Sequence, residues 1–172
     1  MFTEIKIYSR TVALSLIFIS GCVFGESLFA FKTIEDAEKK EIWLNAGMYS
    51  YHYDAKQNLN SNNVGFGAEY KFSSVASVTV GGFKNSDSAH SNYAGIYWEP
   101  ISVGPINLGL VAGGFNGYSS ANNGGWFPAA FPAATIEGEY LGANLFFIPS
   151  VGDRVHGAIS LQLKLKVLDW GG

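Results

Sequence analysis

The sequence predicts an all-β fold, an eight-stranded antiparallel transmembrane β-barrel preceded by a short N-terminal helix or linker. Three observations predict it. First, segments that alternate apolar and polar residues recur along the chain, and such alternation places apolar side chains on one face of a strand. Second, only 15% of the 172 residues are charged, against roughly 25% in average proteins. Third, 15% of the residues are aromatic and an export signal stands first, as in barrels of the bacterial outer membrane.

Residues 1–25 are predicted to be a secretory signal peptide. Lys6 and Arg10 supply the positive region, and residues 11–20 form an apolar segment that is too short to span a bilayer. Cleavage after Gly25 is one reading. Residues 19–22 also resemble a bacterial lipoprotein box, in which Cys22 would carry a lipid. Because Cys22 is the single cysteine, no intramolecular disulfide can form.

Residues 26–41 carry most of the local charge and precede the barrel, which we assign to residues 42–172. Leu28, Phe31, Ile34 and Ala37 recur at near-helical spacing. The segment is therefore interpreted as a short amphipathic helix at the periplasmic membrane surface. A solvated linker is the alternative.

We expect eight strands, at about residues 42–53, 64–72, 75–84, 92–99, 105–114, 130–139, 141–149 and 155–167. In the first strand, Trp43 and the three tyrosines at positions 49, 51 and 53 have the same parity. They are expected on one lipid-facing side, with aromatic rings near both membrane interfaces. The last strand alternates most regularly, with Leu161, Leu163 and Leu165 between polar residues.

A barrel in lipid turns its apolar side chains outward and its polar ones inward. The polar residues expected inside are Glu69, Lys71, Glu99, Glu137, Glu139, Gln162 and Lys164. Both signs of charge are present, so these groups can pair, as buried charges must. The interior of eight strands is just wide enough for side chains to fill, or to hold one slim ligand.

The expected connections alternate in length. Those at residues 73–74, 100–104 and around 140 are short, whereas those at 54–63, 85–91, 115–125 and 150–154 are longer and polar. Outer-membrane barrels place short turns in the periplasm and long loops outside the cell. This parity predicts that both termini of the barrel lie on the periplasmic side.

Composition also excludes several partners and cofactors. The net charge of −3, with no basic patch, argues against nucleic acid. The glycines at 124 and 125 are not followed by a predicted helix, so they do not form a phosphate-binding loop. We expect no cofactor and no metal.

Several short motifs occur in one order and spacing over roughly residues 42–152. They are Tyr53-Asp54, Gly65-Phe66-Gly67, Phe83-Lys84-Asn85-Ser86, Gly95-Ile96-Tyr97-Trp98-Glu99, the segment 108–113, the pair Pro128 and Pro132, and Ile148-Pro149. Together these motifs resemble the lipid A palmitoyltransferases (PagP). The resemblance implies an eight-stranded barrel in the bacterial outer membrane that moves a palmitoyl chain from a phospholipid to lipid A. Lipopolysaccharide and phospholipid would be its partners, and we expect a monomer.

The chemistry of that family carries over only in part. By the same motifs, the family's active-site histidine position holds Met48, its aspartate position holds Asn85, and its serine is retained as Ser86. Methionine does not titrate, and an asparagine amide cannot act as a general base. The resemblance also implies a lateral lipid gate opened by prolines, here Pro132 and Pro149. We therefore expect a non-catalytic or altered-activity member, a surface or lipid-binding protein, with an acyltransferase acting on lipid A as the alternative.

A local substitute for the missing groups is His52, four residues beyond Met48 on the same face and about 13 Å nearer the outer rim. A nucleophile, base and orienter formed by Ser86, His52 and Asp54 is geometrically feasible. The simpler interpretation is that His52 makes a structural hydrogen bond. His156 enters the last strand and is expected to point inward near His52, either as an acid–base or metal partner or within a loop network.

Overall fold

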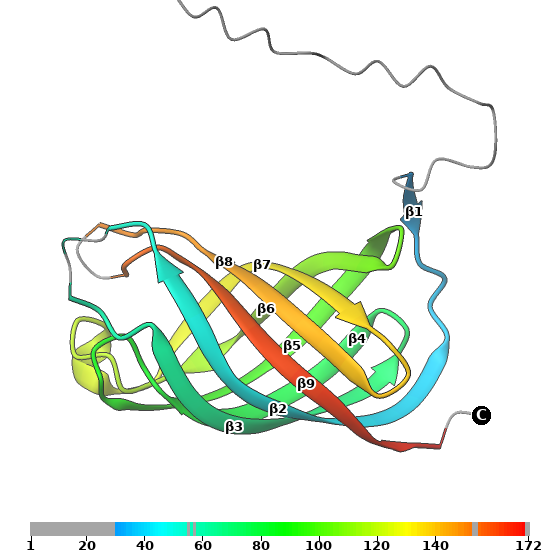
Figure 1. The fold of residues 1–172 in the computed structure, drawn as a ribbon, viewed down its shortest axis with the longest axis horizontal. Helices are drawn as coiled ribbons and strands as arrows, with labels where there is room; N and C mark the ends of the chain where they lie inside the picture. The colour runs from blue at the N-terminus through cyan, green and yellow to red at the C-terminus, as the bar shows by residue number, and fades with distance from the viewer. Residues whose placement is uncertain (1–29, 55, 57, 153–154, 171–172) are drawn as a thin grey trace, which may run out of the picture.

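The structure, a computed structural model, describes residues 30–54, 56, 58–152 and 155–170. Eight antiparallel strands, β2 to β9, pair in chain order, and β9 pairs back to β2, so the sheet is closed (Figure 1). The strands are β2 (Glu38–His52), β3 (Asn62–Ser73), β4 (Ala76–Lys84), β5 (His90–Val103), β6 (Ile106–Phe115), β7 (Phe127–Glu137), β8 (Leu141–Ile148) and β9 (Ala158–Asp169). The predicted eight-stranded barrel is confirmed.

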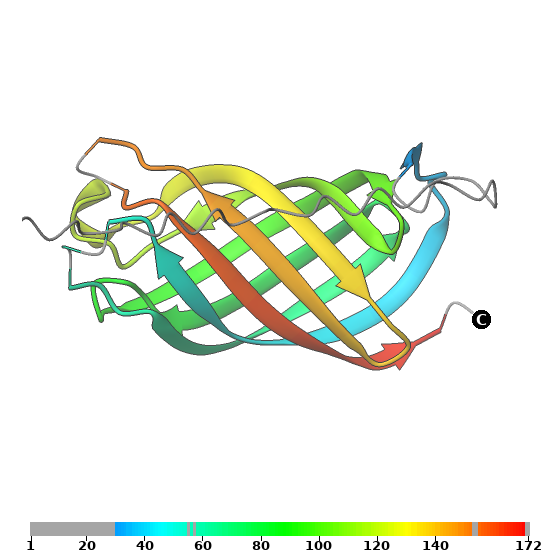
Figure 2. The ribbon, with the colours of Figure 1, turned by 45° about the horizontal axis from the view of Figure 1, so that its top comes forward.

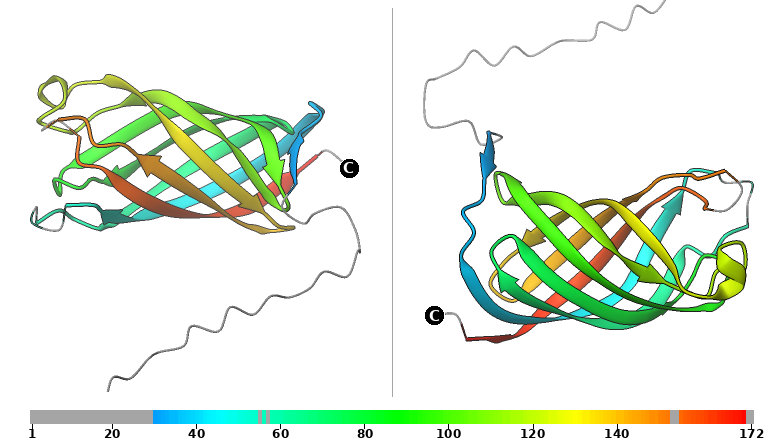
Figure 3. Two further views of the ribbon diagram at one scale, coloured as in Figure 1. Left: turned by 90° about the horizontal axis from the view of Figure 1, so that it is seen from above. Right: turned by 180° about the vertical axis from the view of Figure 1, so that it is seen from behind.

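Short and long connections alternate as predicted. The turns at residues 74–75, 104–105 and 138–140 are short, and the loops at 53–61, 85–89, 116–126 and 149–157 are longer. The long loops gather at one end of the barrel; the start of β2 and the end of β9 lie at the other (Figures 1 and 3). A single turn of 3₁₀ helix, η1 (Asn122–Gly124), lies in the third long loop. The strands run obliquely across the barrel wall (Figure 2).

The N-terminal segment is extended where the structure describes it. β1 (Phe31–Thr33) pairs with residues 101–103 of β5, beyond Trp98, the last β5 residue that pairs with β4. These β5 residues would otherwise present free backbone donors and acceptors at a sheet edge. Residues 31–33 and 38–41 are strand, and the residues between them are not helical, where the spacing had suggested a helix. Residues 26–29, the signal peptide and Cys22 lie outside the described residues, and their assignments remain predictions.

The direction of the side chains in β9 matches the barrel interpretation. Leu163 is 61% exposed on the outer wall, whereas its neighbours Gln162 and Lys164 are each 3% exposed. Large apolar side chains also lie on the outer wall of other strands, including Phe66, Val80, Ile96, Trp98 and Leu110. A soluble protein would turn such a face into its core. The exterior is therefore apolar and the interior polar, as in barrels that meet hydrocarbon.

The first strand differs from its prediction at one position. Trp43 points inward and is fully buried, while the outward tyrosines at positions 49, 51 and 53 are exposed. Between Asn45 and Met48, β2 advances three residues while β9 advances two. This β-bulge exchanges the two faces, because each added residue reverses the parity of all that follow. Trp43 thus belongs to the interior.

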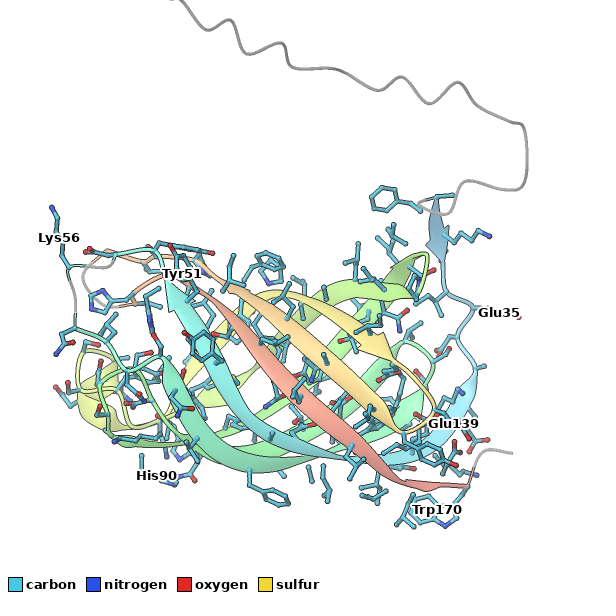
Figure 4. All side chains as sticks on the ribbon, in the orientation of Figure 1. Glu35, Tyr51, Lys56, His90, Glu139 and Trp170 are labelled. Atoms are coloured by element: carbon cyan, nitrogen blue, oxygen red, sulfur yellow. The ribbon has the colours of Figure 1, made fainter. Side chains whose placement is uncertain are left out.

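Glu139 is the second correction. It was expected inside, but it lies in the turn 138–140 and is exposed, at the same end of the barrel as Glu35 and Trp170 (Figure 4). β7 ends at Glu137, so strand alternation no longer applies two residues later. The other polar residues predicted inside do point there. Within the described chain, no helix is long and apolar enough to cross a membrane.

Candidate functional site

The interior contains a cavity of about 670 Å³ in the half of the barrel nearer the long loops. Its walls are mainly apolar. Tyr97, Val111 and Phe146 form a buried cluster against which Met48 and Phe131 pack. The rings of Phe131 and Phe146 meet edge to face with centroids 5.9 Å apart. Small residues on the wall, such as Gly95 and Ala130, leave this space open.

A layer of hydrogen-bonded polar side chains lies beneath the cavity. Gln162 donates from Nε2 to the carbonyl of Ala46 at 3.1 Å and accepts from Asn144 Nδ2 at 3.2 Å. Asn144 also donates to the hydroxyl of Tyr97 at 3.3 Å. Thr135 contacts both Asn144 and Glu99. These bonds cross the interior and close the floor of the cavity.

Charged side chains fill the lumen below that floor. Lys164 binds Glu69 at 3.2 Å and Glu137 at 2.7 Å, and Lys71 binds Glu137 at 2.5 Å. These side chains are largely or fully buried, and none of them lines the cavity. The ion pairs therefore block the lumen on the side of the short turns.

The part of this charged layer nearer the short turns is built around Trp43. Its indole Nε1 donates to Glu41 at 3.0 Å. The ammonium groups of Lys164 and Lys166 lie 4.9 and 5.1 Å from the ring centroid, a cation–π arrangement. Lys166 also pairs with Glu41 at 3.2 Å. The bulge that turned Trp43 inward thus provides an anchor for two lysines.

At the loop end of the cavity, His52 Nε2 lies 2.9 Å from Ser86 Oγ. Ser86 lines the cavity, whereas His52 contacts Ser86 without lining the cavity itself. The parity of β4 alone would aim Ser86 at lipid, but β4 ends at Lys84 and the chain then turns. The serine and histidine predicted to act together are therefore in hydrogen-bonding contact.

The third predicted member, Asp54, is arranged differently. It is exposed, and its carboxylate accepts the backbone N–H of Lys56 at 3.0 Å. Among the described residues, no hydrogen bond joins Asp54 to His52. His156 lies close enough for its charge to act on His52, and it also lines the cavity. No group of three or more metal-ligating side chains occurs in the part of the chain that is described.

Tyr118, which sequence reasoning did not single out, stands beside Ser86 at the cavity mouth. Burial and the charge of Asp87 raise the pKa of Tyr118 to about 12, although contacts with Ser86 oppose the rise. Its ring packs edge to face on Phe127 at 6.0 Å. Tyr118 thus keeps its proton and can act only as a neutral hydroxyl at this site. No sequence motif marks it, because a loop brings it to the serine.

Asn85 has a structural role that explains the amide at this position. Fully buried, it donates to the Ser91 hydroxyl and to the carbonyl of Gly117, both at 2.9 Å. Its oxygen accepts the backbone N–H of Ala89 at 2.9 Å. A carboxylate has no N–H group to donate. Asn85 therefore ties the loop that carries Ser86 to the loop that carries Tyr118.

The barrel wall is incompletely paired between β7 and β8. Their ladder has five residue pairs and ends at Ala133 opposite Phe146, whereas β7 pairs with β6 along all but its last residue, from Phe127 to Ile136. Pro132 is the first residue beyond the end of the ladder, and proline has no N–H to extend it. Pro149 directly follows the last residue of β8. The unpaired part of β7 adjoins the cavity, since residues 127–131 line it.

Comparisons with known proteins support the fold and not a family. No family model matches the sequence, and no curated protein matches it. A solved structure described as "De novo design of transmembrane beta-barrels" is similar, with a TM-score of 0.54 and 17% identity, over 77% of this chain and 100% of that one. At this identity the likeness shows the barrel fold alone. The resemblance to the palmitoyltransferases rests on the sequence motifs.

Proposed function

We propose that this chain is a bacterial outer-membrane barrel that binds one acyl chain of a membrane lipid inside its loop-side half. The observation that carries the proposal is the apolar cavity of about 670 Å³, within the range of about 300–1,000 Å³ usual for small-molecule sites. Its floor is polar and hydrogen-bonded, so a hydrocarbon chain would stop there. Burial of apolar surface would supply the binding free energy.

The unpaired stretch between β7 and β8 supports a lateral route for the lipid. When an acyl chain enters the barrel sideways through the wall, the polar headgroup of its lipid can stay at the membrane surface and need not cross the hydrocarbon region. Pro132 and Pro149 bound this stretch, and we assign them as the lipid gate. Phospholipid and lipopolysaccharide, which meet the outer wall of such a barrel, are the expected ligands, and a monomer suffices for this arrangement.

A pair of variants on one strand tests lipid binding. Val111 faces the cavity and its neighbour Leu110 faces outward. Val111→Phe places a ring in the cavity and should weaken binding of a fluorescent fatty acid by about tenfold, a free-energy change of about 1.4 kcal/mol. Leu110→Phe should leave binding unchanged. Equal affinities for the two variants would contradict an interior site.

The contact between His52 and Ser86 favours a second candidate, acyl transfer from phospholipid to lipid A. In this mechanism Ser86 Oγ attacks the ester carbonyl while His52 Nε2 takes the hydroxyl proton. The alcohol of the donor lipid then leaves with that proton. An acceptor hydroxyl next attacks the acyl-serine carbonyl, His52 passes the acceptor's proton to Ser86 Oγ, and the ester bond to the serine breaks. The exposed position of Asp54 leaves His52 without the orienter that was predicted for it.

Mass spectrometry of lipid A separates the two candidates. Cells expressing the intact chain are compared with cells expressing Ser86→Ala and with cells that lack the protein. Acyl transfer predicts a heavier lipid A only with the intact chain. An unchanged mass in all three removes the transferase and leaves lipid binding to be judged by the cavity variants.

A further inference from the structure

The floor of the cavity contains one acid, Glu99, and the hydrogen bonds around it determine its protonation state. We infer that Glu99 is a protonated carboxylic acid at neutral pH and that it donates the first hydrogen bond of a chain of polar groups crossing the barrel. The inference follows from donors and acceptors alone, and it does not depend on what the cavity binds.

The argument starts from the carbonyl of Ala46, which can only accept. Gln162 approaches it at 3.1 Å, so the amide of Gln162 must present its N–H group to Ala46. The oxygen of Gln162 is then the atom that faces Asn144. A backbone group thereby fixes the orientation of an amide that is otherwise ambiguous.

The same reasoning passes to the next two side chains. Asn144 must present N–H to the oxygen of Gln162, at 3.2 Å, and therefore turns its own oxygen to Thr135. The Thr135 hydroxyl lies 3.2 Å from that oxygen and carries a single hydrogen. If Thr135 donates to Asn144, it has no hydrogen left for Glu99.

Thr135 Oγ1 and Glu99 Oε1 are nevertheless 2.5 Å apart. Two oxygens at this distance without a hydrogen between them would repel. A proton on Glu99 resolves the contact, because the acid then donates to Thr135, which donates to Asn144. The directed chain runs from Glu99 of β5 through Thr135 of β7, Asn144 of β8 and Gln162 of β9 to the Ala46 carbonyl of β2.

The charges around Glu99 lead independently to the same assignment. Lys71 of β3, Lys164 of β9 and Glu137 of β7 act on it electrostatically, and Tyr97 of β5 is a further titratable neighbour. Together with Glu69 of β3, the charged groups in and directly below the floor are three acids and two lysines. Glu69 and Glu137 are ion-paired with those lysines, and among the described residues no ion pair involves Glu99.

The remaining strands add no competing charge near Glu99. Glu41 of β2 pairs with Lys166 one layer further down. The described inward side chains of β4, β6 and β8 include no lysine, histidine or acid. A neutral Glu99 therefore balances the layer, with two carboxylates facing two ammonium groups.

The pH dependence has a definite sign. Because the folded barrel binds the neutral form of Glu99, the contribution of Glu99 to stability is present at low pH. It is lost as pH rises and the proton leaves, since a charge then appears in a closed interior and Thr135 must abandon one of its two contacts. Alkaline pH should thus loosen the cavity floor.

The test compares two isosteric variants of the full chain, refolded in detergent micelles. The amide of Glu99→Gln can donate to Thr135 as the acid does, so its Tm should equal that of the wild type at about pH 4. At neutral pH its Tm should be no lower than that of the wild type, because Glu99 of the unfolded wild-type chain has by then lost its proton. Between about pH 4 and pH 8 the Tm of the wild type should fall roughly 4 °C more than that of Glu99→Gln. The matched control, Glu137→Gln, removes the charge between two lysines and should lower the Tm at every pH.

An infrared band of a protonated carboxyl group, present in the wild type at neutral pH and absent from Glu99→Gln, would support the assignment directly. The inference is overturned if that band is missing, or if Glu99→Gln lowers the Tm at neutral pH as much as Glu137→Gln does. Heat-dependent gel mobility reports whether each variant has folded, so loss of the barrel is not mistaken for loss of the bond.

Discussion

The two halves of the barrel interior are built by the same eight strands and differ in what points inward. On the loop side, methionine, valine, alanine and aromatic residues surround an open cavity. On the short-turn side, lysines and glutamates reach across the lumen and close it. An eight-stranded barrel is just wide enough for this choice to matter, because long charged side chains fill it and small apolar ones do not. The backbone thus sets the width, and the inward residues decide between a cavity and a plug.

The largest effect is expected when the ion pairs that close the short-turn half of the lumen are disrupted. Glu137→Leu leaves Lys71 and Lys164 without the carboxylate that joins them, and removal of one member of a buried ion pair typically costs about 3–5 kcal/mol. We expect a loss of that size in the free energy of unfolding, measured by denaturant titration in micelles. Glu139→Leu, two residues away in an exposed turn, is the matched control and should change stability by less than about 0.5 kcal/mol.

A second variant acts at the cavity mouth. Asn85→Asp introduces the residue type that the resemblance to the palmitoyltransferases implies here, but it removes two donated hydrogen bonds and buries a charge. We expect a loss of about 2 kcal/mol in the free energy of unfolding and no gain in transfer of acyl chains to lipid A. A stable variant with new transfer activity would show that the amide is not needed to hold the two loops together.

The smallest expected effect concerns the wall of the cavity. Pro132→Ala returns an N–H at the end of the β7–β8 ladder, so the ladder can lengthen by one bond and gain about 0.5–1.5 kcal/mol. Hydrogen exchange at Phe147 and Ile148 should slow, and a fluorescent fatty acid should enter more slowly. Pro105→Ala, in the short turn 104–105 at the opposite end of the barrel, is the control. Faster entry in Pro132→Ala would contradict the proposed gate.

The fold was predictable because its signal is local. Alternation in β9 assigns Leu163 to the outside and Lys164 to the inside without knowledge of any other strand. Loop lengths then gave the topology. The failures are local as well. A bulge at Ala46–Gly47 reversed the face of Trp43, and a strand that ends at Glu137 left Glu139 in a turn.

The candidate site was predictable only in part. Ser86 and His52 were paired from spacing along the first and third strands of the barrel, and they lie 2.9 Å apart. Asp54 was assigned by the same parity, but parity has no meaning once a strand has ended, and Asp54 binds the backbone of Lys56 instead. Tyr118 comes from a loop between β6 and β7, so no periodic signal could have placed it next to Ser86.

Alternation along each strand already defines the wall, with eight strands, an apolar exterior and a polar interior, because side-chain direction in a regular strand follows position along it. How the inward side chains meet is a property of the closed barrel. Whether opposite walls meet as ion pairs, enclose a cavity or share a proton at Glu99 depends on contacts between residues as far apart as positions 46 and 162. Closure of the sheet creates those contacts, and no single strand specifies them.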